Sequence, residues 1–227
     1  MEARLAKLKK VYDKLAAFYR LFLSFPIFGL ATEQLTCLPY IRGRKVLEVG
    51  CGTGLTLLQI ARQGRQVLGL DLSPGMLAQA GRRLKSKGLS ISLLQGSYYN
   101  LPFPKNSFDT VVATFTLTHA PNLYPVARGI RRVLNYGGRL IIVDVGLLPG
   151  HDWKSQIINR FWKLLGDHPR DEVPILKDTS FRIIERKKLS KQGAVHLLVA
   201  ENISHNIPLQ QNSIGLDRIG EMPILIW

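Results

Sequence analysis

Short apolar runs alternate with amphipathic stretches between residues 45 and 200 of this 227-residue chain. Apolar and β-branched runs predict strands at 45–49, 66–71, 91–95, 108–114 and 138–145. Apolar positions spaced by three or four residues predict helices at 55–63, 74–86, 121–135 and near 152–165, and two closing strands are expected at 181–186 and 195–200. Such alternation of strands and helices is typical of a doubly wound, parallel α/β sheet.

Local signals fix the ends of two of these helices. Ser73 and Pro74 supply an N-cap and a proline at the first helical position of the 74–86 helix. The pair Gly137-Gly138 predicts the end of the helix that precedes the fifth strand, because glycine commonly stops a helix.

The two ends of the chain have patterns of their own. Apolar residues recur at helical spacing through 3–23, at Leu5, Leu8, Tyr12, Leu15, Tyr19 and Phe22. Lys7, Lys10 and Lys14 lie on or beside the other face, so an amphipathic helix is predicted. A short helix to about Cys37 precedes Pro39, and the last 26 residues contain no lysine and many Asn, Gln and Ser residues, which leaves their role open.

Residues 46–54 read Val-Leu-Glu-Val-Gly-Cys-Gly-Thr-Gly, between a predicted strand and a predicted helix. Open α/β sheets bind ligands at this kind of turn, where glycine lets the backbone approach the ligand. Leu55 stands where the dinucleotide fingerprint has a third glycine, and Glu48 would repel a pyrophosphate. A carboxylate at Glu48 suits a cationic amine and Asp71 suits ribose hydroxyls. An amine and a ribose without phosphate describe S-adenosylmethionine.

Five segments then carry a family resemblance, in matching order and spacing: 48–54, 69–76, Asn100-Leu-Pro-Phe103, Phe108-Asp109 and 137–140. From about Tyr12 to Glu201 the chain resembles the class I S-adenosylmethionine-dependent methyltransferases. It is closest to the ubiquinone/menaquinone C-methyltransferases and the bacterial phospholipid N-methyltransferases. The resemblance implies a Rossmann-like, mostly parallel seven-stranded sheet whose last strand is antiparallel. It also implies an N-terminal helical lid at 1–40 and a cofactor-binding domain at 41–201. The family pattern does not extend to the tail at 202–227, whose role is unknown.

The resemblance also implies roles for individual residues. The expected cofactor-binding residues are Tyr19, Glu48, Gly50, Cys51, Gly52, Asp71, Leu72, Met76, Ser97, Tyr98 and Thr114. Glu48 and the turn would line the methionine part, Asp71 the ribose, and Leu72 and Met76 the adenine. Ser97 stands where the family often has an aspartate that faces the adenine amine. The expected substrate-binding residues are Tyr12, Phe115, His119 and Tyr124.

Methyl transfer from a sulfonium chiefly requires alignment of the nucleophile with the methyl group. A base is needed only where the nucleophile arrives protonated. His119 follows the fourth predicted strand and is the best-placed side chain for proton removal, and Tyr98, Tyr99 and Tyr124 are candidates for an aromatic wall beside a cation.

Charge and composition bear on partners rather than on fold. The formal net charge is +15, and residues 46–150 contain only four acids, Glu48, Asp71, Asp109 and Asp144, each in or at the end of a predicted strand near a turn or the ligand-binding edge. A cationic surface favours an anionic membrane face or nucleic acid. Cys37 and Cys51 are the only cysteines, so a reducing cytoplasm is expected. No metal-ligand spacing occurs, and the apolar window 21–31 is too short to span a bilayer.

Three functions compete. A membrane-surface methyltransferase acting on a lipid or lipophilic acceptor accounts for the charge and the basic leader together. Phospholipid head-group amines are favoured over quinone-type ring carbons, because the quinone enzymes carry Arg-Asn where this chain has Thr118-His119. An RNA methyltransferase is the second reading, although the fourth strand lacks the Asn/Asp-Pro-Pro-Tyr of amino-methylating nucleic-acid enzymes. A non-catalytic partner subunit is the third, and the oligomeric state stays open.

Overall fold

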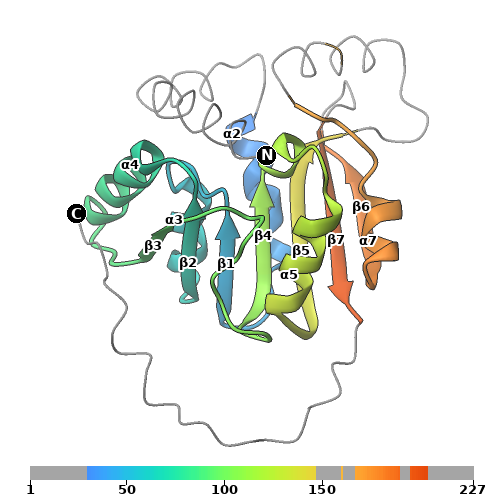
Figure 1. Cartoon of the computed structure of the whole chain (residues 1–227). Coiled ribbons are helices and arrows are strands. Elements are labelled where there is room, and N and C mark those ends of the chain that lie inside the picture. The colour runs from blue at the N-terminus through green and yellow to red at the C-terminus, as the bar shows by residue number, and fades with distance from the viewer. Residues whose placement is uncertain (1–29, 147–159, 161–166, 190–194, 204–227) are drawn as a thin grey trace, which may run out of the picture.

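A seven-stranded sheet forms the centre of the computed structural model, with strand order β3-β2-β1-β4-β5-β7-β6 (Figure 1). The structure describes residues 30–146, 160, 167–189 and 195–203. The strands are β1 (Lys45–Val49), β2 (Gln66–Asp71), β3 (Ser92–Gln95), β4 (Phe108–Thr114), β5 (Leu134–Val145), β6 (Phe181–Lys188) and β7 (Val195–Asn202). The first five strands pair in parallel, and β7 runs antiparallel to both β5 and β6. The predicted α/β class and the antiparallel last strand are confirmed.

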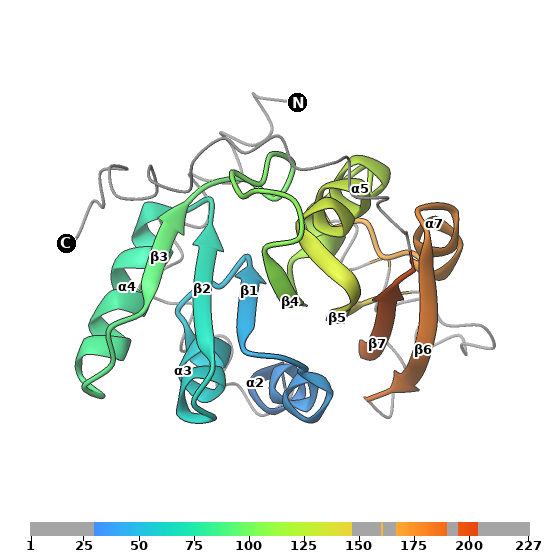
Figure 2. The same ribbon diagram turned by 90° about the horizontal axis from the view of Figure 1, so that it is seen from below.

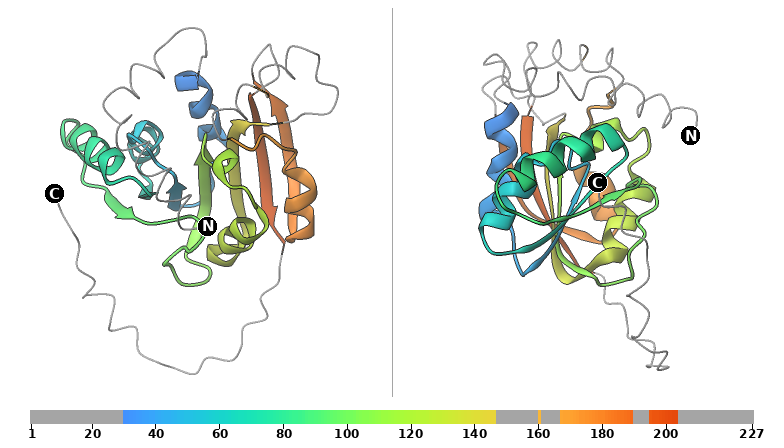
Figure 3. Two further views of the ribbon diagram at one scale, coloured as in Figure 1. Left: turned by 45° about the horizontal axis from the view of Figure 1, so that its top comes forward. Right: turned by 90° about the vertical axis from the view of Figure 1, so that its left-hand side faces the viewer.

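Helices cover both faces of the sheet (Figure 2). One face carries α2 (Leu30–Glu33), the 3-10 helix η1 (Gln34–Tyr40), α3 (Leu55–Arg62) and α4 (Pro74–Lys85), and the other carries α5 (Tyr124–Val133) and α7 (Val173–Asp178). A short 3-10 turn, η2 (Leu117–His119), follows β4. Two further views show how the sheet twists between its outer strands (Figure 3).

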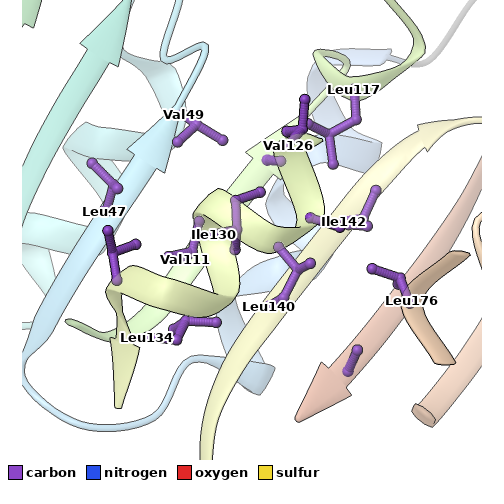
Figure 4. Close-up of a cluster of buried hydrophobic side chains, with 14 of the residues drawn as sticks. Leu47, Val49, Val111, Leu117, Val126, Ile130, Leu134, Leu140, Ile142 and Leu176 are labelled. Carbon is purple, nitrogen blue, oxygen red and sulfur yellow. The ribbon is translucent and has the colours of Figure 1, made fainter. Parts of the chain in front are cut away.

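Strands β1, β4, β5 and β7 are buried along most of their length, as expected of central strands in a doubly wound sheet, whereas β3 and β6 at the two edges are more exposed. The largest apolar cluster packs α5 against β4 and β5, where Val126 and Ile130 lie over Val111 and Leu140 (Figure 4). A second cluster on the opposite face joins Cys37 of η1 to strands β1, β4, β5 and β7. The two cysteines, Cys37 and Cys51, are buried and free, so neither forms a disulfide.

Ser73 caps α4 as predicted, since its side chain accepts a hydrogen bond from the Met76 amide at 3.1 Å.

The helix predicted at 121–135 exists, but both of its predicted ends are wrong. The helix α5 spans only Tyr124–Val133, and β5 begins at Leu134. Gly137-Gly138 therefore lies within β5, at an irregularity where the register to β4 shifts between Phe108 and Thr110. Gly137 has a φ of 70°, and a Cβ on Gly138 would lie 2.8 Å from a backbone oxygen, so glycine serves a bulge here and not a helix end.

Other differences concern the outer elements. The short helix predicted to end at about Cys37, before Pro39, does not end there, because η1 continues through Pro39 to Tyr40. The helix α7 was not predicted at all. The predicted helix at 3–23, the lid residues Tyr12 and Tyr19, the 204–227 part of the tail and, apart from residue 160, the predicted helix near 152–165 lie outside the described residues.

Asp109 lies at the amino end of β4, on the edge opposite the glycine turn. Its Oδ2 accepts hydrogen bonds from the amides of Arg44 and Lys45 at 2.8 and 3.0 Å, and its Oδ1 accepts one from Asn135 Nδ2 at 2.7 Å. Partial burial would raise its pKa, but these hydrogen bonds outweigh that effect and lower the pKa. Asp109 therefore fastens the entry of β1 to β4 and β5.

We expect Asp109→Ala to lower the free energy of unfolding by about 1 kcal/mol, because two amides and one side-chain amide lose a charged acceptor that is partly screened by solvent. The difference should be full above the ordinary aspartate pKa of about 3.9 and should disappear as the pH falls through the lowered folded-state pKa. Urea unfolding at pH 7 and pH 3 measures it. The matched control is Asp178→Ala, which removes an exposed acid hydrogen-bonded to Tyr124 Oη. Equal losses in the two variants would contradict this role.

Candidate active site

The carboxyl ends of β1, β2 and β4 converge on one pocket at the point where the strand order reverses, which is where open α/β sheets bind ligands. Its lining consists of Gly50, Gly52, Leu70, Asp71, Leu72, Met76, Gly96, Ser97, Tyr98, Thr114, Phe115, Thr116 and His119. Ten of the residues predicted for cofactor or substrate belong to this lining. The lining residues Leu70, Gly96 and Thr116 were not predicted.

The glycine turn is shaped by two constraints that only glycine meets. Gly50 and Gly52 both have left-handed backbone, with φ values of 66° and 51°. A Cβ on Gly50 would lie 2.1 Å from Thr116 Oγ1, so the turn and the segment after β4 touch at this residue. Thr116 Oγ1 also donates a hydrogen bond to the Gly50 carbonyl at 3.3 Å. The amides of Gly50 and Cys51 donate to Leu70 O, which joins the turn to β2.

Asp71 ends β2 with its carboxylate fixed in place. Oδ2 accepts a hydrogen bond from the Gly52 amide at 2.7 Å, and Oδ1 accepts one from the Ser73 amide at 2.9 Å. Burial raises its pKa against these hydrogen bonds. A carboxylate has about four lone-pair sites, so each oxygen of Asp71 can accept one further hydrogen bond. A molecule bound in the pocket could supply these bonds from two neighbouring hydroxyls.

Glu48 and Cys51 were predicted to line the pocket, but neither side chain is among its lining residues. Cys51 instead packs in an apolar cluster with Leu57 and Leu58. Glu48 is 1% exposed beneath the turn, and its Oε1 accepts a hydrogen bond from Thr114 Oγ1 at 3.4 Å. Burial, with a smaller effect from the charge of Asp71, raises the pKa of Glu48 to about 8. Its Oε2 is buried and, within the described residues, accepts no hydrogen bond of good geometry.

The segment after β4 is organised by one buried carboxylate. Asp144 Oδ2 accepts hydrogen bonds from three successive amides, those of Thr116, Leu117 and Thr118, at 3.1, 2.8 and 3.2 Å. Its Oδ1 accepts one from Thr118 Oγ1 at 3.0 Å. Phe115, which opens this turn, is a non-glycine residue with a φ of 50°; it belongs to the pocket lining, and its side chain packs against the second apolar cluster. The role of Asp144 was not predicted, although its position at a strand end was.

His119 ends this turn and lines the pocket with a side chain that is 21% exposed. Its Nδ1 lies 2.5 Å from Oδ1 of Asp167, a buried carboxylate that was not predicted. Burial would lower the pKa of His119, but the hydrogen bond and charge of Asp167 and the charges of Asp144 and Asp71 raise it. The ring is therefore the basic group of the pocket wall.

The remaining predicted residues differ in their surroundings. Ser97 lines the pocket, and its Oγ accepts a hydrogen bond from the Tyr99 amide at 3.2 Å. Tyr98 lines the pocket and stacks at a tilt on Tyr99, with ring centroids 5.0 Å apart. Tyr124 is 36% exposed and donates a hydrogen bond to Asp178, outside the pocket lining. The structure thus brings Tyr98 to the predicted site and not Tyr124.

Known proteins share this arrangement. A family model described as a methyltransferase domain matches residues 47–142. Demethylmenaquinone methyltransferase of Listeria welshimeri is 33% identical over 172 residues, which are 71% of this chain and 72% of that protein. Sterol 24-C-methyltransferase of Gibberella zeae is 42% identical over 99 residues, 42% of this chain and 26% of that protein.

Among solved structures, the geranyl diphosphate C-methyltransferase of Streptomyces coelicolor A3(2), in complex with S-adenosyl-L-homocysteine, superposes with a TM-score of 0.65. It is 13% identical, over 76% of this chain and 77% of that one, and so shares the fold. None of the helices in the described part of the chain is long and apolar enough to span a bilayer. The pocket at the switch point and the identity to the Listeria enzyme lead to one conclusion: this chain belongs to the class I S-adenosylmethionine-dependent methyltransferases.

Proposed function

We propose that this enzyme transfers the methyl group to a ring carbon of a lipophilic, quinol-type acceptor. The observation that carries the proposal is the 33% identity to a protein named for demethylmenaquinone, over most of both chains. The sterol enzyme, which matches a shorter region, is also named for a lipophilic acceptor and for transfer to carbon. The phospholipid amine favoured by Thr118-His119 has no counterpart in the names of these two relatives, so we place it second.

The residues of the pocket fit the cofactor of this family. Glu48 lies beneath the glycine turn and outside the pocket lining, and a cationic amine bound at the turn would favour its ionised form over the raised pKa. Asp71 is fixed so that it can accept the two hydroxyls of a ribose, and Leu72 and Met76 offer apolar contact to an adenine beside Ser97. When bound there, S-adenosylmethionine supplies a methyl group on a positively charged sulfur.

The other side of the pocket suits a ring-shaped acceptor. Tyr98 and Phe115 are its aromatic lining residues, while Thr114, Thr116 and His119 are its polar residues at and after the end of β4. Apolar walls with few polar groups are typical of sites that orient a lipophilic molecule. The hydrogen bonds of Asp144 to the residues that follow Phe115 stabilise its strained left-handed backbone and so fix the position of Phe115 beside the pocket.

We further propose that the acceptor is reached at an anionic membrane surface. Support comes from the net charge of +15 and from exposed cations on α4 and α5, among them Arg82, Lys85 and Arg128. Each such cation near an anionic surface is worth about 1 kcal/mol, an attraction that salt screens. The leader with Lys7, Lys10 and Lys14 would add to it and lies outside the described residues.

Asp71→Ala should weaken binding of S-adenosylhomocysteine about 10- to 150-fold, because charge-assisted hydrogen bonds to the ribose are worth about 1.5–3 kcal/mol. Titration calorimetry measures the affinity. Because Asp71 also accepts the amides of Gly52 and Ser73, Asp71→Asn is included, and the melting temperature of each variant is compared with the parent. Unchanged affinity in both variants would remove Asp71 from the ribose site.

The acceptor is tested with radiolabelled S-adenosylmethionine and three substrates offered separately: demethylmenaquinol kept reduced in vesicles, phosphatidylethanolamine vesicles and total RNA. Ring methylation is expected, and it should be faster when the quinol vesicles contain anionic lipid than when they are neutral. Label in the phosphatidylethanolamine head group would show that the methyl acceptor is an amine and not a ring carbon. Label in RNA alone would overturn the lipophilic acceptor altogether.

A further inference from the structure

Two pairs of a histidine and a buried carboxylate lie at the carboxyl edge of the sheet, and they differ in whether the histidine reaches the pocket. His196 and Glu172 are 0% and 2% exposed, lie 3.0 Å apart, and do not line the pocket. His119 and Asp167 lie 2.5 Å apart, with Asp167 buried and the imidazole reaching the pocket wall. The first pair is a structural element of the core, whereas the second joins a buried acid to the site where an acceptor would bind.

The segment that carries Asp167 is fastened to the turn that carries His119. The His168 amide donates to Thr118 O at 2.7 Å. Arg170 Nε donates to His168 O at 2.9 Å, and its guanidinium also donates to the carbonyls of Ala120 and Pro121. Backbone contacts on both sides of His119 therefore hold Asp167 against the imidazole, independently of the ion pair itself.

We propose that Asp167 orients His119 as the proton acceptor of the reaction, and that the methyl acceptor therefore carries a weakly acidic ring hydroxyl next to the carbon that is methylated. The proposal rests on the ring-methylation function above and assigns the residues that remove the proton of the quinol hydroxyl. His119 is the catalytic residue and Asp167 is a positioning residue. The 2.5 Å contact of Nδ1 with the Asp167 carboxylate favours the tautomer that carries its proton on Nδ1 and leaves the basic lone pair on Nε2.

The proton and electron balance is simple. The hydroxyl proton passes to Nε2 of His119, and the resulting oxyanion places electron density on the neighbouring ring carbon. That carbon forms a bond to the methyl group as the carbon–sulfur bond breaks, and the electron pair stays on the now neutral sulfur. The hydrogen on the same ring carbon is then lost as a proton, which restores the aromatic ring as an oxyanion, and this oxygen takes back the proton held on Nε2 of His119. One proton leaves the reaction, and no oxidant or reductant takes part.

The charged groups around His119 set its pKa and therefore the pH range in which it can accept a proton. Asp167, Asp144 and Asp71 are negative, and each favours the protonated ring. The guanidinium of Arg170 donates its hydrogen bonds to the backbone carbonyls of Ala120, Pro121 and His168. The parent should therefore lose activity as the pH falls through a value above the ordinary histidine pKa of about 6.5, because only the neutral ring accepts a proton.

The test compares the parent, His119→Gln and Asp167→Asn with demethylmenaquinol as acceptor. His119→Gln should lower kcat about 10²- to 10⁴-fold while S-adenosylhomocysteine binds with affinity within about 2-fold of the parent. Asp167→Asn should lower the pKa of His119, read by NMR titration, by about 1 or more, and should move the acid limb of kcat/KM down by the same amount. The rate ratio of parent to variant should consequently shrink at low pH.

The control is Glu172→Gln, which alters the other buried pair. It should lower the melting temperature and leave the acid limb of kcat/KM in place, because its partner His196 lies outside the pocket lining. If the parent methylates the quinol and neither dyad variant changes the pH profile, the dyad is overturned and the ring-methylation function stands. If the parent does not methylate the quinol, the ring-methylation function is wrong, and the inference that His119 deprotonates a ring hydroxyl of the acceptor is wrong as well.

Discussion

The buried carboxylate of Asp144 sets the geometry on which the pocket depends. At 0% exposure it accepts hydrogen bonds from three consecutive amides and a threonine hydroxyl of the turn after β4. Left-handed backbone at a non-glycine residue such as Phe115 costs about 1–3 kcal/mol and persists only where neighbouring interactions determine it. Removing one partner of such a network leaves buried polar groups unpaired, so the turn has one favourable arrangement. That arrangement places Phe115, Thr116 and His119 on one wall.

The opposite wall depends on the same turn through a single close approach. Thr116 occupies the space that any side chain on Gly50 would need, and its hydroxyl donates to the Gly50 carbonyl. The glycine turn and the segment after β4 therefore cannot shift independently. Because β1 and β4 are neighbours at the reversal of strand order, this contact lies where the two halves of the sheet diverge. The requirement for glycine at this position comes from packing between distant segments as well as from the backbone turn.

Sequence patterns predicted what is locally encoded. The strand–turn–helix at 45–62, the carboxylate of Asp71 and the cap at Ser73 each follow from residues within a few positions of one another, and the structure has all three. The pairing of His119 with Asp167 spans 48 positions and leaves no periodic trace, so only the folded chain reveals it. The irregular start of β5 was missed because Gly137-Gly138 stops a helix or forms a bulge equally well, and the choice depends on the register to β4. Glu48 and Cys51 were placed in the pocket by their motif, whereas their burial is decided by packing against Thr114 and Leu57.

The buried acids and the exposed cations of this chain lie in different places and have different effects on the site. The chain is strongly cationic overall, yet its buried acids Glu48, Asp144, Asp167 and Glu172 surround the carboxyl edge of the sheet. Buried carboxylates raise one another's pKa, so such a cluster persists only with hydrogen bonds and cationic partners. Here the amides of the turn, two histidines and Arg170 provide them from within the chain. A positively charged methyl donor adds to these partners before transfer and loses its charge on transfer, so the field of the site favours the donor over its neutral product. The exposed cations do not weaken this field, because solvent screens them from the buried groups.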